Sequence, residues 1–217
     1  PTIDPADPYR LSPEEEEVMI ALEASILRSD KLQEHIQFLY SHGALYKTLN
    51  GNLMFHGCIP FTEDGEFRDV TINGITQHGA KLMEYLDKEL RDAYFNPPKG
   101  KTRAEAANLM WYLWLGPDSP LFGKDKMTTF ERLFIADKAT HKEHVVPYYR
   151  LINQKDICVK MIRDFGLDAS HGKILNGHVP VKIKDGESPI KGGGMLYVID
   201  GGISKAYQKT TGIAGYT

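Results

Sequence analysis

Two short stretches decide the architecture of this chain: residues 51–60, GNLMFHGCIP, and residues 176–180, NGHVP. In each, a short apolar run leads to a histidine beside a glycine-containing turn, His56 in the first and His178 in the second. A buried strand that ends in this way delivers an imidazole to the edge of a sheet, where α/β proteins build their sites. If the two strands are neighbours in one sheet, both imidazoles can reach one metal ion.

The composition bounds the class of protein. The chain has 217 residues, of which 41% are hydrophobic, enough for one domain with its own core. The net charge of −3 gives no reason to expect nucleic acid or a membrane surface as a partner. No apolar run has the length of a membrane span, and no signal peptide opens the sequence. The two cysteines, Cys58 and Cys158, lack CxxC spacing and fit a reducing, cytoplasmic compartment.

Local patterns predict long helices between short strands, which is typical of an α/β protein with some hairpin character. Residues 1–11 are expected to form an extended arm. Ser12-Pro13-Glu14-Glu15 has the form of a capping box and predicts a helix to about Leu27, with a second helix from near Asp30. The Asn50-Gly51 pair favours a type I′ turn and predicts a hairpin that joins residues 44–49 to residues 52–56.

The rest of the chain continues this alternation. Helices are expected over residues 75–94, 106–115, 128–134 and 156–165, strands at 174–175 and 195–199, and a hairpin around 184–186. A capping box at Thr102 and Glu105 precedes the helix at 106–115, which is apolar on nearly every side and is therefore expected to be buried together with Trp111 and Trp114. Residues 211–217 have the pattern of a strand that has only started.

His56 and His178 stand out among the candidate site residues, because burial of an imidazole beside a glycine turn without a partner is costly. His141 and His144 have i, i+3 spacing that could bind a metal, but a solvated face is favoured. His171 is ambiguous, and the remaining histidines, His35, His42 and His78, are interpreted as structural or solvated. Cys58 could be a nucleophile or a zinc ligand, but a small buried hydrophobe is favoured.

Charged residues provide further candidates. Lysines that could supply positive charge to phosphate groups are Lys124, Lys126, Lys182, Lys191 and Lys205, although most lysines only keep a surface solvated. Asp200 follows the strand at 195–199, a place where functional carboxylates occur. Residues 192–194, GGG, precede a strand rather than a helix, so they are interpreted as a flexible turn and not as a phosphate-binding loop.

Longer motifs carry a resemblance to a known family. FHGCIP at 55–60, NGHVPVK at 176–182, GESPIKGGG at 186–194 and the segment from LYVIDGG at 196–202 to the end resemble class III fructose-1,6-bisphosphatases. The segments at 111–132, WYLWLGPDSPLFGKDKMTTFER, and 2–16, TIDPADPYRLSPEEE, extend the resemblance over essentially the whole chain.

The resemblance implies a fold and a chemistry. That family belongs to the calcineurin-like metallophosphoesterases, whose fold is a β-sandwich flanked by helices with a dinuclear metal site at the strand ends. It implies that His56 and His178 are metal ligands and that the metal is manganese. The implied reaction is hydrolysis of the 1-phosphate of fructose 1,6-bisphosphate to give fructose 6-phosphate in gluconeogenesis, by a water that the two ions activate.

One departure from the family's pattern is informative. The superfamily motifs DxH, GDxxDR and GNH(D/E) supply the remaining ligands, and none of them occurs here; the only GN, at residues 51–52, is followed by Leu53. The chain is therefore interpreted as a single partial domain over 1–217, the C-terminal part of a metallophosphatase catalytic domain without its N-terminal strands. It is not expected to complete a dinuclear site alone, and its open sheet edges would favour a homo-oligomer.

Two other classes of function stay open. One is a non-catalytic phosphosugar-binding or structural segment, which equal phosphate binding with and without metal would favour. The other is a different metallophosphoesterase, a phosphodiesterase or a protein phosphatase, which a substrate panel would reveal. The matches at 116–132 and 186–207 favour the sugar bisphosphatase, because they lie outside the metal motifs that the superfamily shares.

Overall fold

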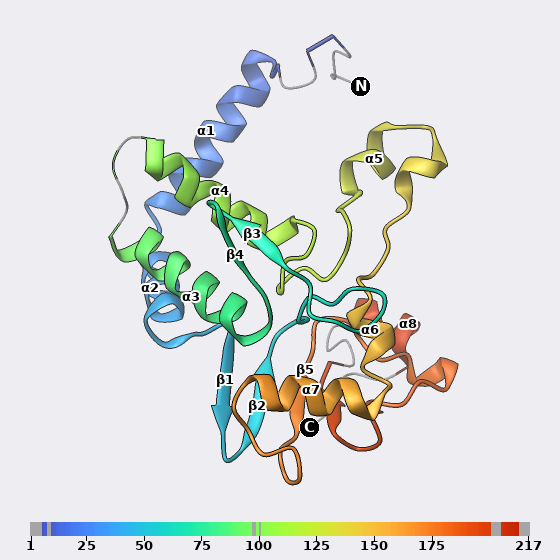
Figure 1. The fold of residues 1–217 in the computed structure, drawn as a ribbon. Coiled ribbons are helices and arrows are strands. Elements are labelled where there is room, and N and C mark those ends of the chain that lie inside the picture. Colours follow the sequence, from blue (N-terminus) through green and yellow to red (C-terminus); the bar gives the residue numbers. More distant parts are fainter. Residues whose placement is uncertain (1–5, 8–9, 97–98, 100, 201–204, 213–217) are drawn as a thin grey trace.

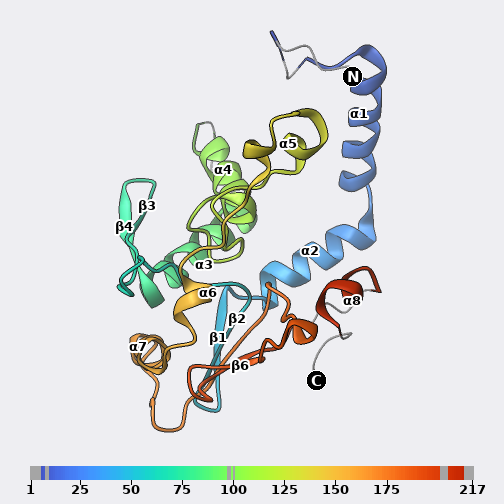
Figure 2. The same cartoon turned by 90° about the vertical axis from the view of Figure 1, so that its right-hand side faces the viewer.

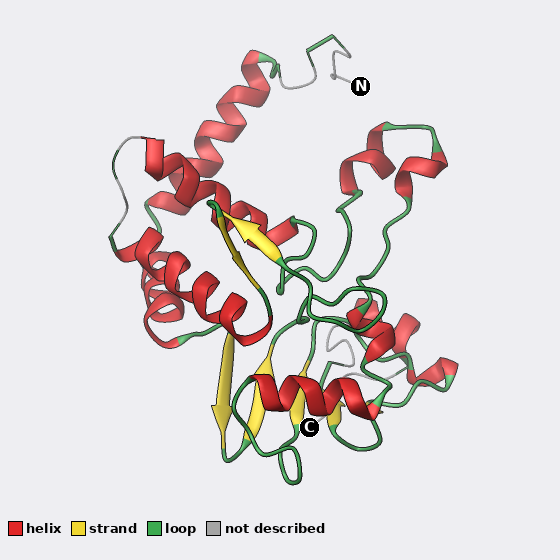
Figure 3. Cartoon of the chain, in the orientation of Figure 1, coloured by secondary structure: helices red, strands yellow, loops and turns green. Residues whose placement is uncertain are grey.

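The chain folds into an α/β arrangement of one mixed sheet, a separate hairpin and surrounding helices (Figures 1 and 3). The structure, a computed structural model, describes residues 6–7, 10–96, 99, 101–200 and 205–212. Most of the arm expected at 1–11 and of the strand expected at 211–217 lies outside these residues, although Thr211 itself ends a helix. Among the described residues, no helix combines the length and the apolar character needed to cross a bilayer.

The elements follow one another in a mixed order. The helices are α1 (Pro13–Leu27), α2 (Asp30–His42), α3 (Gly79–Phe95), α4 (Lys101–Leu115), α5 (Thr129–Phe134), α6 (Tyr148–Leu151), α7 (Lys155–Asp164) and α8 (Lys205–Thr211), with the 3-10 helices η1 (Lys138–His141) and η2 (Ile183–Asp185). The strands are β1 (Tyr46–Leu49), β2 (Asn52–Phe55), β3 (Val70–Ile72), β4 (Ile75–Gln77), β5 (Ile174–Asn176), β6 (Ile190–Lys191) and β7 (Leu196–Val198).

The main sheet has the strand order β1-β2-β5-β7-β6. Its three central strands, β2, β5 and β7, are mutually parallel, and the edge strands β1 and β6 are antiparallel to their neighbours. Leu53 lies opposite Ile174, which lies opposite Leu196, and all three side chains are fully buried. This row fixes the register, because a slip of one residue would turn it to the other face.

The core forms where α7 crosses the sheet (Figure 1). The face of α7 that packs on the sheet contributes Cys158, Met161 and Ile162, which have no exposed surface. Leu82 and Leu86 from α3 join the same core. The parallel strands are thus covered by a helix, as parallel sheets require, and their carboxyl ends emerge together at one edge.

Several local predictions are confirmed. Ser12 accepts from the backbone of Glu15 and Glu15 reaches back to Ser12, so the capping box at the start of α1 is complete. The turn between β1 and β2 has positive φ angles of 51° at Asn50 and 76° at Gly51, as a type I′ turn requires. The predicted helix ends at about Leu27 and at Phe165, and the predicted strands at 174–175 and 195–199, agree with the observed elements to within about one residue.

The helix predicted over residues 75–94 is wrong at its start. Residues 75–77 form β4, which pairs with β3 through a second Asn-Gly turn at Asn73-Gly74, with φ angles of 52° and 77°. The helix begins only at Gly79. The helical spacing of the leucines was correct for α3, but the turn signal at 73–74 is the same as that at 50–51, and it determines where the helix can begin.

Three further expectations are wrong. Helix α4 begins at Lys101 and so already includes Thr102, and it is not buried on all sides, because Trp111 is 59% and Trp114 is 65% exposed. The segment around 184–186 is the 3-10 helix η2 and not a hairpin; the hairpin forms between β6 and β7 through the glycines at 192–194. All three of these glycines have positive φ angles, which is why this segment makes the tight turn.

Candidate functional site

Three strand ends meet at the carboxyl edge of the main sheet. His56 follows β2 directly, His178 follows β5, and Asp200 follows β7. Beyond the last strand residues, the Gly177 amide donates to the His56 carbonyl at 2.8 Å, and the Ile199 amide donates to the Asn176 carbonyl at 2.8 Å. The two histidine-bearing strands are therefore neighbours in one sheet, which is the condition for both imidazoles to reach one place.

The two imidazoles are in direct contact. His56 Nε2 lies 2.9 Å from His178 Nδ1, and the ring centroids are 4.8 Å apart. The other ring nitrogen of His178, Nε2, lies 2.8 Å from the carbonyl oxygen of Phe122. Because a carbonyl oxygen only accepts, we assign the proton of His178 to Nε2, so that its Nδ1 accepts from His56 Nε2 while both rings are neutral.

The backbone of His178 has an unusual conformation. Its φ angle is 69°, in the left-handed region that non-glycine residues occupy at a cost of order 1 kcal/mol. The tie to Phe122 and the Gly177 bond to the His56 carbonyl hold the residue there. The backbone strain is thus found at His178, whose ring contacts His56, and strained backbone is often found at functional sites.

The surroundings keep His56 neutral. Partial burial is the largest influence and lowers its pKa, and neighbouring His178 lowers the pKa further, while Asp200 acts in the opposite direction. A lowered pKa favours the neutral ring at neutral pH, and neutral imidazole is the form that binds metal ions.

Buried hydrogen bonds hold the turn that follows His56. The Asn176 side chain, only 1% exposed, donates through Nδ2 to the Gly57 carbonyl at 3.0 Å. The Cys58 amide donates to the Pro120 carbonyl at 2.9 Å. Cys58 has no exposed surface, and burial raises the pKa of its thiol, which agrees with a buried hydrophobe and not with a nucleophile. This thiol also approaches the carbonyl of buried Ser119.

A cavity of about 580 Å³ opens beside the histidine pair, between α2, α3 and α4. None of the five candidate lysines is among the described residues that line it. Lys124 forms an ion pair with Glu143 at 2.7 Å, and Lys191 forms one with Glu187 at 2.9 Å. The other three, Lys126, Lys182 and Lys205, are exposed and do not line the cavity.

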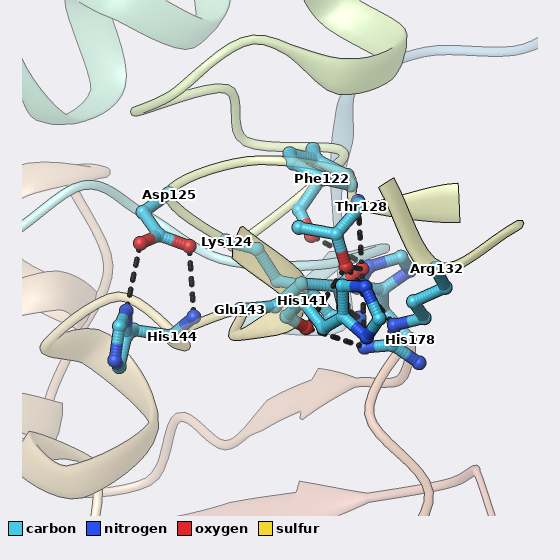
Figure 4. Close-up of polar contacts among 9 residues, drawn as sticks. All are labelled: Phe122, Lys124, Asp125, Thr128, Arg132, His141, Glu143, His144 and His178. Atoms are coloured by element: carbon cyan, nitrogen blue, oxygen red, sulfur yellow. Dashed lines mark hydrogen bonds and ion pairs between the residues drawn. The ribbon is translucent and has the colours of Figure 1, made fainter. Parts of the chain in front are cut away.

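Sequence reasoning missed the polar cluster around Glu143 (Figure 4). Its carboxylate accepts from Lys124 Nζ at 2.7 Å, and from the backbone amide and hydroxyl of Thr128 at 3.0 and 2.9 Å. These partners lie 15 and 19 residues away in sequence, so no local pattern could have indicated them. The cluster fastens the start of α5 to the loop that follows Phe122.

The other histidine pair does not form a site. His144 Nδ1 faces Asp125 Oδ2 at 2.8 Å, apart from the Glu143 cluster (Figure 4). The His141 ring instead lies against the Ile135 carbonyl, with Nε2 at 2.8 Å from the oxygen. His171 contacts Asp168 and Ser170 on the surface. Across the described part of the chain, no group of three or more His, Cys, Asp or Glu residues is arranged to hold a metal ion.

Comparison with known proteins confirms the resemblance. A family model described as Firmicute fructose-1,6-bisphosphatase matches residues 1–217. The chain belongs to this family. Curated Firmicute relatives named fructose-1,6-bisphosphatase class 3 are 53% identical in Clostridium acetobutylicum and 52% identical in Clostridium tetani, each over 217 residues, and 52% identical in Alkaliphilus metalliredigens over 219 residues. Each alignment covers all of this chain but only 33% of the fructose-1,6-bisphosphatase. The chain thus spans about a third of the length of these relatives, and no solved structure matches it.

Proposed function

We propose that this chain is part of an enzyme that hydrolyses fructose 1,6-bisphosphate to fructose 6-phosphate and phosphate, a step of gluconeogenesis. Family membership over the whole chain supports the reaction. The observation that carries the location of the site is the 2.9 Å contact between His56 and His178 at the carboxyl edge of three parallel strands. Functional groups of α/β proteins gather at such an edge.

The histidine pair fits a shared divalent ion. The two rings present His56 Nε2 and His178 Nδ1 to the same place, 2.9 Å apart, and neutral imidazole nitrogen is a common ligand of divalent metal ions. We propose that these two atoms hold an ion once His56 has moved its proton from Nε2 to Nδ1, and the family resemblance favours manganese. Bound ions would supply an activated water and neutralise phosphate charge.

The described residues do not complete such a site, because a two-ion centre needs more donors than two imidazoles. We propose that the remaining ligands come from parts of the enzyme outside residues 1–217. The same parts would complete a metallophosphoesterase-like sandwich, of which the sheet described above would be one portion. Residues 1–217 are then one partial domain, and the chain alone is expected to be inactive.

Residues of this chain would prepare the site. The Phe122 carbonyl holds the proton of His178 on Nε2 and leaves Nδ1 for a metal ion, in the manner of outer-shell partners of metal-bound histidines. Asn176 fixes the turn after His56 through the Gly57 carbonyl. For phosphate binding, Lys126, Lys182 and Lys205 remain proposals, whereas Lys124 and Lys191 would first have to leave their glutamate partners.

The experiment measures phosphate release from fructose 1,6-bisphosphate by the full-length enzyme, with and without manganese. His56→Ala and His178→Ala are expected to abolish the metal-dependent turnover and the thermal stabilisation by manganese. His171→Ala is a matched control, because the side chain is 89% exposed and lies away from the pair. Full turnover in either site variant would refute the assignment.

A substrate panel addresses the other classes of function. Faster cleavage of an aryl phosphodiester or a phosphopeptide than of the sugar bisphosphate would indicate a different metallophosphoesterase. Sugar phosphate binding without turnover, equal with and without manganese, would indicate a non-catalytic module. The isolated 217-residue chain is assayed alongside, and metal-dependent turnover by it would show that the ligands outside 1–217 are not needed.

A further inference from the structure

The cavity beside the histidine pair is apolar. Its wall is formed by α2, α3, α4 and the loop that leads to Phe122, and in Figure 1 these three helices lie together on the left. The apolar lining residues include Leu39, Leu90, Met110, Leu113, Trp114 and Phe122. Cavities of this volume, a few hundred cubic ångströms, accept a ligand or several side chains.

The charges of the lining argue against a phosphate ligand. Apart from the histidines, the charged residues that line the cavity are Asp87 and Arg91. Arg91 donates to Asp87 Oδ2 at 2.8 Å and also to the backbone carbonyls of Tyr40 and Gly43. Three of its donors are therefore engaged, two of them with the end of α2, and the described lining offers no other lysine or arginine. Away from an ion at the histidine pair, the described lining therefore offers a sugar bisphosphate no free cation, and most of it is hydrocarbon.

The surface around the cavity is apolar as well. Leu39 and Trp114, which line it, are 62% and 65% exposed, and Phe38, next to Leu39 in α2, is 65% exposed. Large apolar patches on a soluble protein mark a surface that another surface covers. The Trp114 ring gains most from such a cover, because burial of an aromatic side chain contributes more than burial of most others.

Helix α1 also exposes several large apolar side chains. It has no buried residue in the structure, and Figure 2 shows that it stands away from the sheet. Its exposed large apolar residues are Val18, Met19, Ile20, Leu22, Ile26 and Leu27. Most of the stability of a protein helix comes from packing of an apolar face, so α1 requires a partner surface.

We infer that the α2–α4 cavity and the exposed face around Leu39 and Trp114 seat an apolar segment of the same polypeptide, contributed from outside residues 1–217. Relatives of this chain are about three times as long, and an enzyme of that length would carry further polypeptide that could cover this surface. The preference for the same polypeptide over a second copy of the chain rests on the proposed function. In that proposal, polypeptide from outside residues 1–217 supplies ligands near His56 and His178, and these two histidines line the cavity.

The test is hydroxyl-radical footprinting of the full-length enzyme, read by mass spectrometry and without metal or substrate. The native rate at each residue is divided by the rate in the same enzyme unfolded in urea, which removes differences in intrinsic reactivity. Leu39 and Trp114 are expected to react at least about tenfold more slowly in the native enzyme, as buried side chains do. Native rates near those of an open surface would overturn the inference.

A dilution series separates the two occupants. Protection by the same polypeptide is independent of enzyme concentration, whereas protection by a second copy disappears as the oligomer dissociates. Loss of protection on dilution, together with a fall in molar mass by light scattering, would overturn the assignment to the same chain.

A matched pair of variants tests the seat itself. Trp114→Glu places a charge at the cavity, and Phe130→Glu places the same charge at a similarly exposed ring on α5, outside the cavity lining. Trp114→Glu is expected to restore labelling of Leu39, whereas Phe130→Glu leaves it protected; equal effects would contradict the inference. If Trp114→Glu does not fold, Trp114→Ala gives the same comparison against Phe130→Ala. None of these readouts requires catalysis, so a failure of the phosphatase assay and a failure of the seat are distinguishable.

Discussion

Removing the charge of Glu143 tests the polar cluster that holds the start of α5 to the loop that follows Phe122. Glu143→Gln keeps an acceptor for the Thr128 amide but loses the ion pair between its carboxylate and Lys124 Nζ, which are 2.7 Å apart. The Glu143 side chain is only 16% exposed. An exchange of one atom type therefore isolates the contribution of the charge.

The magnitude follows from the pKa of Glu143. The bond from Lys124 is the largest influence, and with the bonds from Thr128 it lowers the pKa from 4.5 to about 2. At 1.36 kcal/mol per pKa unit, this difference corresponds to roughly 3 kcal/mol as an upper bound. Lys124 is 35% exposed, so solvent screening reduces the expected loss to about 2 kcal/mol.

The sign of the pH dependence is defined. Because the folded pKa is lowered, the stabilisation is fully present above about pH 4.5, the value expected in the unfolded state, and is lost as the pH falls towards the folded value. The difference between wild type and Glu143→Gln should therefore be largest near neutral pH and shrink below pH 4.5.

Hydrogen exchange of the amides in α5, corrected for intrinsic rates, measures this local stability in the full-length enzyme. Glu131→Gln, the same change on α5 outside the cluster, serves as the control and should alter protection little. A wild-type minus Glu143→Gln difference that stays constant between pH 7 and about pH 3 would refute the assignment of the stabilisation to the carboxylate charge.

Three further outcomes follow from the structure. A Cβ at Gly57 would lie 2.4 Å from the Pro120 carbonyl oxygen, so Gly57→Ala should lower the unfolding free energy by roughly 1–3 kcal/mol in chemical denaturation; an unchanged midpoint would contradict the close approach. Leu53 is fully buried, and Leu53→Ala should cost about 2–5 kcal/mol in the same assay, a loss below about 1 kcal/mol being the contrary result. Burial raises the pKa of Cys58, and that of Cys158 to about 11, so neither thiol should react with Ellman's reagent at pH 8 until the protein unfolds; rapid labelling of the native enzyme would show that the thiols are accessible.

Much of the local structure could be predicted because it depends on neighbours in the chain. The capping box at Ser12 and the Asn50-Gly51 turn act over two to four residues, and both formed as expected. The start of α3 was mispredicted although its signal was local, because the Asn73-Gly74 turn competes with the helical spacing that follows it.

Burial of α4 could not be read from its composition. Trp111 and Trp114 are apolar whether a partner covers them or not, and in this chain they are largely exposed. The apolar composition shows that burial would stabilise the helix, but only the arrangement of the other elements shows how much of its surface this chain covers. The exposed apolar surface around Trp114 is the surface that we infer another segment covers.

The candidate site divides along the same line. Sequence by itself singled out His56 and His178, because an apolar run, a histidine and a glycine turn form a local pattern that recurs at both places. Only the tertiary structure brought the rings to 2.9 Å, since parallel pairing of β2 with β5 joins residues 122 positions apart. The Phe122 carbonyl that sets the proton of His178 and the Glu143 cluster also required the fold, because hydrogen bonds between distant segments leave no periodicity in the sequence.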